Sequence, residues 1–237
     1  MTVKNLLIIT PVKDSVVTSI ESITLVCQSR KEYPYRVYND CSLPESRTVL
    51  EHGIALGYEL INIEEYVDTP SPNYRFTLID ARKKALEMDA HLLIVESDVF
   101  VKPETIDRLV EHAANENNCG MVAAITTDES GEINFPYNHI KKGLTGVIQT
   151  RHRISFCCTL LTNDLLKKID FNKLSSEKHW HDVQISKKSR KSGFRNLIDS
   201  DLKVVHIPHS SRPWKKMKYE NPIKYYIHKF LKKSDRI

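Results

Sequence analysis

The feature that most constrains the fold is a regular alternation of short apolar runs with longer amphipathic stretches. The apolar runs lie at residues 5–10, 35–40, 58–63, 91–101 and 120–126. The stretches between them have apolar residues at helical spacing and lie at residues 14–30, 43–57, 74–89 and 102–117. Strands that alternate with helices of this length predict a parallel sheet covered on both faces. We therefore expect an α/β fold with a doubly wound, mostly parallel, Rossmann-like sheet.

Local signals mark some of the helix ends. Asp14 stands where an N-cap residue would begin the first helix, and Pro44 and Gly57 flank the second. After residue 127 the regular pattern stops, and residues 128–153 read as a long excursion of the kind that often carries function. The remaining elements that we expect are a strand at 154–162, helices at 163–169 and 181–193, and a last strand at 202–209.

Composition favours a soluble protein inside the cell. The chain has 237 residues, of which 41% are hydrophobic and 27% charged, as is ordinary for a globular domain. No run approaches the roughly 18 apolar residues that a membrane span needs, and the N-terminus lacks the features of a signal peptide. The five cysteines lack the paired spacing of a zinc site, so we expect reduced and mostly buried thiols. They are Cys27, Cys41, Cys119, Cys157 and Cys158.

Positive charge is concentrated at the C-terminus. The whole chain has a net charge of +5, and residues 213–237 hold eight Lys or Arg against two Asp or Glu. Within this segment an amphipathic helix is expected, with an apolar stripe that includes Ile223, Ile227 and Phe230. The helix could pack on its own domain or lie on an anionic membrane. The rest of the chain is close to neutral and has no nucleic-acid motif, which argues against a nucleic-acid partner.

Carboxylates follow the apolar run at 91–101 at the point where ligands are usually bound in such sheets. Glu96 and Asp98 come at its end, and Asp40 follows the run at 35–40. Because parallel strands end at one edge of the sheet, these side chains should share that edge. Carboxylate oxygens suit hard cations such as Mg²⁺ or Mn²⁺. The alternative is an ordinary solvated turn, where aspartate is common.

Six short motifs, taken in order, resemble those of the inverting nucleotide-sugar glycosyltransferases of family 2, which have the GT-A fold. The resemblance covers residues 3 to about 210. The motifs are TPVKDS (10–15), NDCS (39–42), ARKKAL (81–86), ESD (96–98), HDVQISKKSRKSGF (181–194) and VVH (204–206). The resemblance implies a GT-A domain at 1–210, with a nucleotide-sugar half at 1–127 and an acceptor half at 128–210. Residues 211–237 would then be a basic C-terminal extension.

The resemblance implies a role for each motif. Asp98 and His206 would bind a divalent metal, Mn²⁺ or Mg²⁺, and Asp182 would be the general base that takes the acceptor's proton. The residues implied in nucleotide-sugar binding are Pro11, Val12, Asp40, Arg82, Glu96 and Ser97. Of these, Asp40 would contact the base, Arg82 would lie near the diphosphate, and Glu96 would contact the ribose or a metal-bound water.

Other interpretations of these residues remain open. His206 could be a satisfied core histidine, with His179, His181 or His209 as the ligand instead. Asp182 could be a helix N-cap, and Arg82 a solvated helix residue.

The chain also departs from the family's pattern. Glu96 replaces the usual aspartate, His181 replaces a glutamate, and Cys41 replaces a glycine. The cysteine indicates that this turn does not need a positive φ.

The function implied is transfer of a sugar, with inversion, from a UDP- or GDP-type donor to a saccharide or lipid-linked acceptor. Synthesis of surface polysaccharide or glycoconjugates is the expected setting. The expected location is the cytoplasm, with the inner face of the membrane as an alternative. A catalytically silent nucleotide-sugar-binding protein of the same fold is the competing hypothesis.

Overall fold

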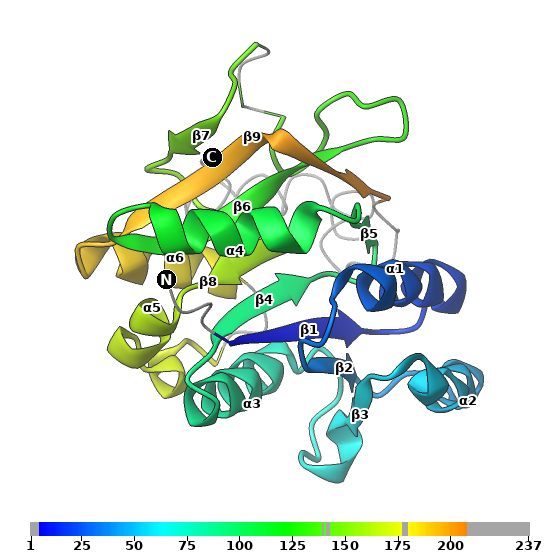
Figure 1. The fold of residues 1–237 in the computed structure, drawn as a ribbon. Coiled ribbons are helices and arrows are strands. Elements are labelled where there is room, and N and C mark those ends of the chain that lie inside the picture. Colours follow the sequence, from blue (N-terminus) through cyan, green and yellow to red (C-terminus); the bar gives the residue numbers. More distant parts are fainter. Residues whose placement is uncertain (1–4, 139, 141–142, 177–179, 208–237) are drawn as a thin grey trace, which may run out of the picture.

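The computed structural model describes residues 5–138, 140, 143–176 and 180–207. A single sheet forms the centre, with helices packed on both of its faces (Figure 1). The strands are β1 (Leu6–Val12), β2 (Tyr35–Asn39), β3 (Glu59–Asn62), β4 (His91–Val95), β5 (Val99–Phe100), β6 (Cys119–Thr127), β7 (Val147–Gln149), β8 (Cys158–Leu161) and β9 (Arg195–His206). The α-helices are α1 (Val16–Ser29), α2 (Pro44–His52), α3 (Tyr74–Glu87), α4 (Thr105–Asn115), α5 (Asn163–Lys168) and α6 (His181–Lys191). Short 3₁₀ turns are η1 (Gly53–Leu56), η2 (Ile63–Glu65) and η3 (Phe171–Lys173).

The strand order is β3-β2-β1-β4-β8-β6-β9-β5, and β7 pairs with β9 outside this path. Strands β3, β2, β1 and β4 are each parallel to the next in this order, and β6 is parallel to β9. Strand β8 runs antiparallel to both β4 and β6, and β5 and β7 run antiparallel to β9. The expected mostly parallel α/β sheet is therefore confirmed, with antiparallel strands added in its second half.

The alternation of side chains along each strand builds two apolar layers. Leu6 and Ile8 of β1 point into one cluster, with buried residues of α1, α2 and α4. Leu7 and Ile9 point into the other, with buried residues of α3, α5 and α6. Since both faces of these strands are covered, they are apolar at successive positions, as is typical of parallel sheets with helices on both sides.

Three details of the sequence prediction were wrong. The first helix begins at Val16. Its N-cap position is Ser15, whose side chain makes no capping hydrogen bond. Asp14 instead accepts a hydrogen bond from the Leu43 amide at 2.8 Å, and so joins the loops after β1 and β2. Cys41 has a φ of 54°, so this turn does adopt the left-handed conformation that was expected to be absent. The last strand begins at Arg195, well before residue 202.

Among the helices that the structure describes, none combines the length and apolar character needed to cross a membrane. The predicted C-terminal extension, residues 211–237, lies outside the described residues.

Candidate functional site

The turn after β4 brings the predicted carboxylates to the edge of the sheet where β1, β2 and β4 all end. Residues 96–98 form this turn, and Ser97 at its centre is buried. The chain then continues into β5, which pairs antiparallel with the end of β9, so that Val99 lies opposite His206. The Asp98 carbonyl accepts a hydrogen bond from the Ile207 amide at 2.9 Å. This pairing fixes Asp98 beside His206, although the two are far apart in the sequence.

Asp98 and His206 are in contact and almost completely buried. Asp98 Oδ2 lies 3.5 Å from His206 Nε2, and the two residues are 2% and 1% exposed. His206 Nδ1 lies 2.7 Å from the carbonyl oxygen of Phe135. A carbonyl can only accept, so Nδ1 carries the proton in this bond, and a neutral ring presents a lone pair at Nε2. Nε2 makes no hydrogen bond among the described residues, which is how a histidine that ligates a metal is held.

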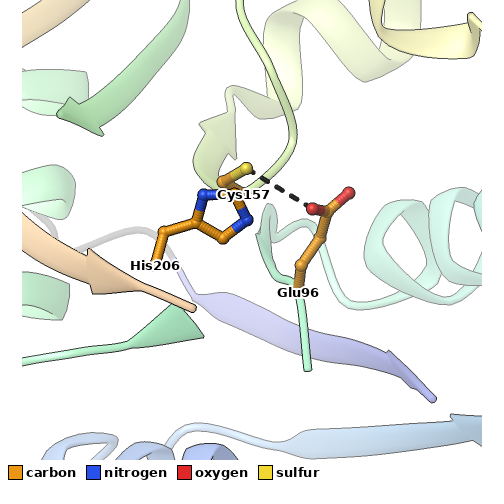
Figure 2. A group of neighbouring side chains, drawn as sticks. All are labelled: Glu96, Cys157 and His206. Atoms are coloured by element: carbon orange, nitrogen blue, oxygen red, sulfur yellow. Dashed lines mark hydrogen bonds between the residues drawn. The ribbon is translucent and has the colours of Figure 1, made fainter. Parts of the chain in front are cut away.

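Glu96 and Cys157 lie next to this pair. The Glu96 amide donates to the Cys157 carbonyl at 2.9 Å, and Cys157 Sγ lies 3.4 Å from Glu96 Oε2. One potential ligand atom from each of Glu96, Cys157 and His206 falls within 4.8 Å of the others (Figure 2). Cys157 was expected only as a buried thiol. Sequence spacing gave no signal for it, because it is 61 residues from Glu96.

The donors present fit a divalent cation. Carboxylate oxygens from Glu96 and Asp98 suit Mg²⁺ and Mn²⁺, and an imidazole nitrogen suits transition metals better than Mg²⁺. The buried Nε2 of His206, with no hydrogen bond among the described residues, is the observation that supports this fit. Neither His179 nor His209 lies in the described residues, and His181 is buried and stacked on Tyr74, with ring centroids 6.3 Å apart.

Asp182 lies in the first turn of α6. The N-cap position of this helix is Trp180, so Asp182 is not the cap. Its Oδ1 accepts from the Val183 amide at 2.8 Å, and its Oδ2 lies 3.4 Å from Nη1 of Arg153. The partial positive charge of the helix N-terminus and the guanidinium both favour the ionised carboxylate.

Phe135 links the surroundings of Asp182 to those of His206. Its carbonyl holds Nδ1 of His206, and its ring lies 6.0 Å from the guanidinium carbon of Arg153. Nearby, Tyr137 is buried and donates weakly to the Ser155 carbonyl at 3.4 Å. The expected excursion at 128–153 therefore contributes residues that meet both parts of the site.

Tyr137 adds a further polar group that the sequence did not single out. Burial raises the pKa of its phenol well above the usual value, and the nearby Cys157 and Asp182 raise it further. The phenol therefore stays protonated at all ordinary pH values.

Asp40 lies at the end of β2, next to the end of β1. Its amide donates to the Val12 carbonyl at 2.8 Å, and Val12 pairs with Asn39. Its carboxylate accepts from the Ser71 hydroxyl at 2.7 Å and from the Asn73 amide and side chain at 2.8 and 2.9 Å. Asp40 thus anchors the loop before α3.

Pro11, in β1, is partly exposed, and Val12, at the strand's end, is buried. The Lys13 ammonium binds the Cys41 carbonyl and joins the two loops at this edge.

The structure does not bring Arg82 to this edge. Its Nε donates to the Leu166 carbonyl of α5 at 2.9 Å, and its guanidinium lies 5.6 Å from the centre of the Phe171 ring. Helix α5 begins at Asn163, which bonds with His91 at the start of β4. The Arg82 side chain therefore packs toward α5 and η3, and its role near a diphosphate stays a prediction.

Comparison with known proteins identifies the fold. No model of a protein family matches the chain, and no curated protein matches it in sequence. Among solved structures, it is similar to the mannosyltransferase PcManGT from Pyrobaculum calidifontis in complex with GDP-Man and Mn²⁺, with a TM-score of 0.63 and 13% identity, covering 96% of this chain and 64% of that one. It is also similar to S. aureus TarS 1–349 in complex with UDP, with a TM-score of 0.61 and 16% identity over 90% of this chain and 62% of that one.

A third similar structure is GalNAc-T7 with UDP, GalNAc and Mn²⁺, with a TM-score of 0.59, 11% identity, and coverage of 89% of this chain and 45% of that one. The chain therefore has the GT-A fold of nucleotide-sugar glycosyltransferases. It spans less than two thirds of the length of each of these three proteins.

Proposed function

We propose that this protein is a glycosyltransferase that moves a sugar from a nucleoside-diphosphate donor to an acceptor hydroxyl, with inversion. The observation that carries the proposal is the buried contact between Asp98 and His206 at the ligand-binding edge of a GT-A fold. Two similar structures hold Mn²⁺, one with GDP-Man and one with UDP and GalNAc. A UDP- or GDP-type donor and Mn²⁺ or Mg²⁺ are accordingly the ligands that we propose.

In this proposal Asp98 and His206 hold the cation, and Glu96 contacts the ribose or a metal-bound water. A bound divalent cation offsets the negative charge that develops on a departing diphosphate. The chain's own contribution is to hold the Nε2 lone pair of His206 in place through the Phe135 carbonyl. It also keeps Asp98 in a buried setting, where electrostatic interactions are stronger than in water.

Asp182 is the residue that we propose as general base. Its Oδ1 accepts the Val183 amide, and its Oδ2 faces Arg153 at 3.4 Å. A carboxylate oxygen has more than one lone pair, so Oδ2 can face Arg153 and still accept the proton of an acceptor hydroxyl as that hydroxyl attacks. Attack from the face opposite the leaving group gives inversion.

Donor hydrolysis and transfer, measured with and without Mn²⁺, test the proposal. We expect turnover that requires the cation, and an Asp182→Asn rate lower by roughly 10²–10⁴, the usual contribution of a general base, with Mn²⁺ affinity unchanged. Glu104→Gln, an exposed substitution at the residue before α4, is the control. Nucleotide binding without any turnover in the presence of acceptor would instead support the silent binding protein. The anomeric configuration of the product, read by NMR, tests inversion.

The acceptor and the location stay predictions. A saccharide or lipid-linked acceptor in polysaccharide or glycoconjugate synthesis fits the reaction. We propose that the protein acts in the cytoplasm, with the basic segment at 211–237 contacting the anionic inner face of the membrane. Binding of the full chain to vesicles with and without anionic lipid tests this contact, and equal retention by both would contradict it.

A further inference from the structure

Cys157 lies in a group of three potential metal ligands, with Glu96 and His206. It is completely buried in the segment just before β8, and its sulfur lies 3.4 Å from Glu96 Oε2 and 3.3 Å from the Ser155 hydroxyl. Figure 2 shows its side chain meeting those of Glu96 and His206, which come from the end of β4 and the end of β9. Three separate segments of the chain thus deliver a sulfur, an oxygen and a nitrogen to one point.

The spacing of these atoms matches that of ligands around one ion. Ligands at about 2.3 Å (sulfur) and about 2.0 Å (oxygen or nitrogen) from a tetrahedral ion lie roughly 3.5 Å from one another. The observed distance between sulfur and carboxylate is 3.4 Å, and the three ligand atoms lie within 4.8 Å of one another. Only a small inward movement of side chains would complete the coordination.

His206 supports the same conclusion independently. His206 is 1% exposed, and its Nδ1 is held by a hydrogen bond of 2.7 Å to the Phe135 carbonyl. Its Nε2 makes no hydrogen bond among the described residues, and the nearest acid contact, to Asp98 Oδ2, is 3.5 Å long. A buried nitrogen in this state costs stability unless something binds it.

From these observations we propose that Cys157 is a metal ligand, and that Glu96 binds the cation directly in place of the indirect contact given to it above. Glu96, Cys157 and His206 then form a site that prefers thiophilic divalent cations such as Zn²⁺ to Mg²⁺. The proposal deepens the metal site of the proposed function and rests on it. Thiolate and imidazole favour Zn²⁺ and Co²⁺, whereas all-oxygen sets favour Mg²⁺. A consequence is that Zn²⁺ competes with Mn²⁺ for the site that includes Asp98.

Absorption spectroscopy of the full chain with Co²⁺ tests the sulfur ligand directly, without measuring turnover. A cobalt–thiolate bond gives an intense near-ultraviolet charge-transfer band, which oxygen and nitrogen ligands do not give. We expect this band in the native chain and in Cys158→Ser, and its loss in Cys157→Ser. Cys158 is the matched control because it is the next residue, is equally buried, and lies in β8 opposite Val95. A band that persists in Cys157→Ser, or none in the native chain, would overturn the proposal.

X-ray absorption of the native chain with one equivalent of Zn²⁺ covers the case in which Cys157→Ser does not fold. We expect one sulfur at about 2.3 Å from zinc, and a shell of light atoms alone contradicts the proposal. Mn²⁺ binding, measured in parallel by calorimetry, separates this proposal from the proposed function. If Mn²⁺ binds the native chain but the zinc spectrum shows no sulfur ligand, only the role of Cys157 is overturned. If no divalent cation binds at all, the metal site of the proposed function fails as well.

Discussion

Strand β9 carries two buried polar groups in two very different settings. At its middle, the completely buried Asp199 accepts from Arg108 Nη2 at 2.6 Å and lies 2.8 Å from His112 Nε2, and its other oxygen accepts the amides of Asp201 and Leu202. At its end, His206 has one ring nitrogen bonded and the other without a hydrogen bond among the described residues. We call these the Asp199 network and the His206 site.

The difference separates a polar network that is complete within the chain from a site that we propose binds a ligand. The Asp199 network is complete within the chain, and it lies where the pairing of β6 with β9 shifts register after Ala124. It holds that irregular part of the sheet in place. The His206 site uses residues from three segments and leaves a lone pair in a buried position. Groups of this kind are retained when a ligand completes them, because leaving a buried polar atom unbonded costs about 1–3 kcal/mol.

The largest effect that we expect is on the Asp199 network. Asp199→Ala leaves Arg108, His112 and the amides of Asp201 and Leu202 without their acceptor, and each buried group left unbonded costs about 1–3 kcal/mol of unfolding free energy. Urea unfolding measures this loss. Asp201→Asn, an exposed change in the same strand, is the control and should have little effect. If Asp199→Ala lost metal binding rather than stability, the comparison between the two settings would be reversed.

The His206 site should respond in the opposite way. We expect Asp98→Asn to change the stability of the metal-free protein by less than about 1 kcal/mol, since the lost contact is offset by removal of a buried charge. The variant should lose the stabilisation of about 2.7 kcal/mol that Mn²⁺ gives at 100 times its Kd. Thermal unfolding with and without Mn²⁺ measures both quantities, with Glu104→Gln as the control. An unchanged Mn²⁺ effect would exclude Asp98 as a ligand.

The smallest effect concerns Arg82, which the sequence assigned to the ligand and the structure assigns to helix packing. Arg82→Gln removes the bond to the Leu166 carbonyl and should cost about 1 kcal/mol of unfolding free energy. Nucleotide affinity should stay within about twofold of the native value. Lys83→Gln, at the exposed neighbouring position, controls for the loss of charge alone. A tenfold weaker affinity for a nucleoside diphosphate would restore the role that the sequence suggested.

The parallel part of the fold could be predicted from the sequence because its signals are local. In β1 to β4 the apolar runs and the helices between them alternate regularly, and a carboxylate that follows a strand must lie at the sheet edge. Asp98 and His206 lie close together, as expected from the resemblance, which implied that both bind one metal ion. Local patterns did not reveal β7 or the first half of β9, where Asp199 and Asp201 interrupt the apolar run.

The rest of the site depends on contacts between distant segments. Cys157 meets Glu96 only because β8 pairs with β4, and an antiparallel insertion of this kind leaves no spacing motif. Arg82 was expected near the ligand, but a motif fixes the residue's helix and not the direction of its side chain, which bonds to α5. Cys41 adopts a positive φ although it is not glycine, since the Lys13 ammonium and the loop around Asp40 hold the turn. These are tertiary effects that no window of sequence contains.

The most direct test of the central claim is thermal unfolding of the native chain and of Asp98→Asn with UDP or GDP, each with and without Mn²⁺. The proposed metal site predicts that one of the nucleotides raises the melting temperature of the native chain, that Mn²⁺ is required for most of the increase, and that Asp98→Asn loses it. An equal increase in both proteins, or no increase with either nucleotide, would contradict a nucleotide site built around Asp98 and His206.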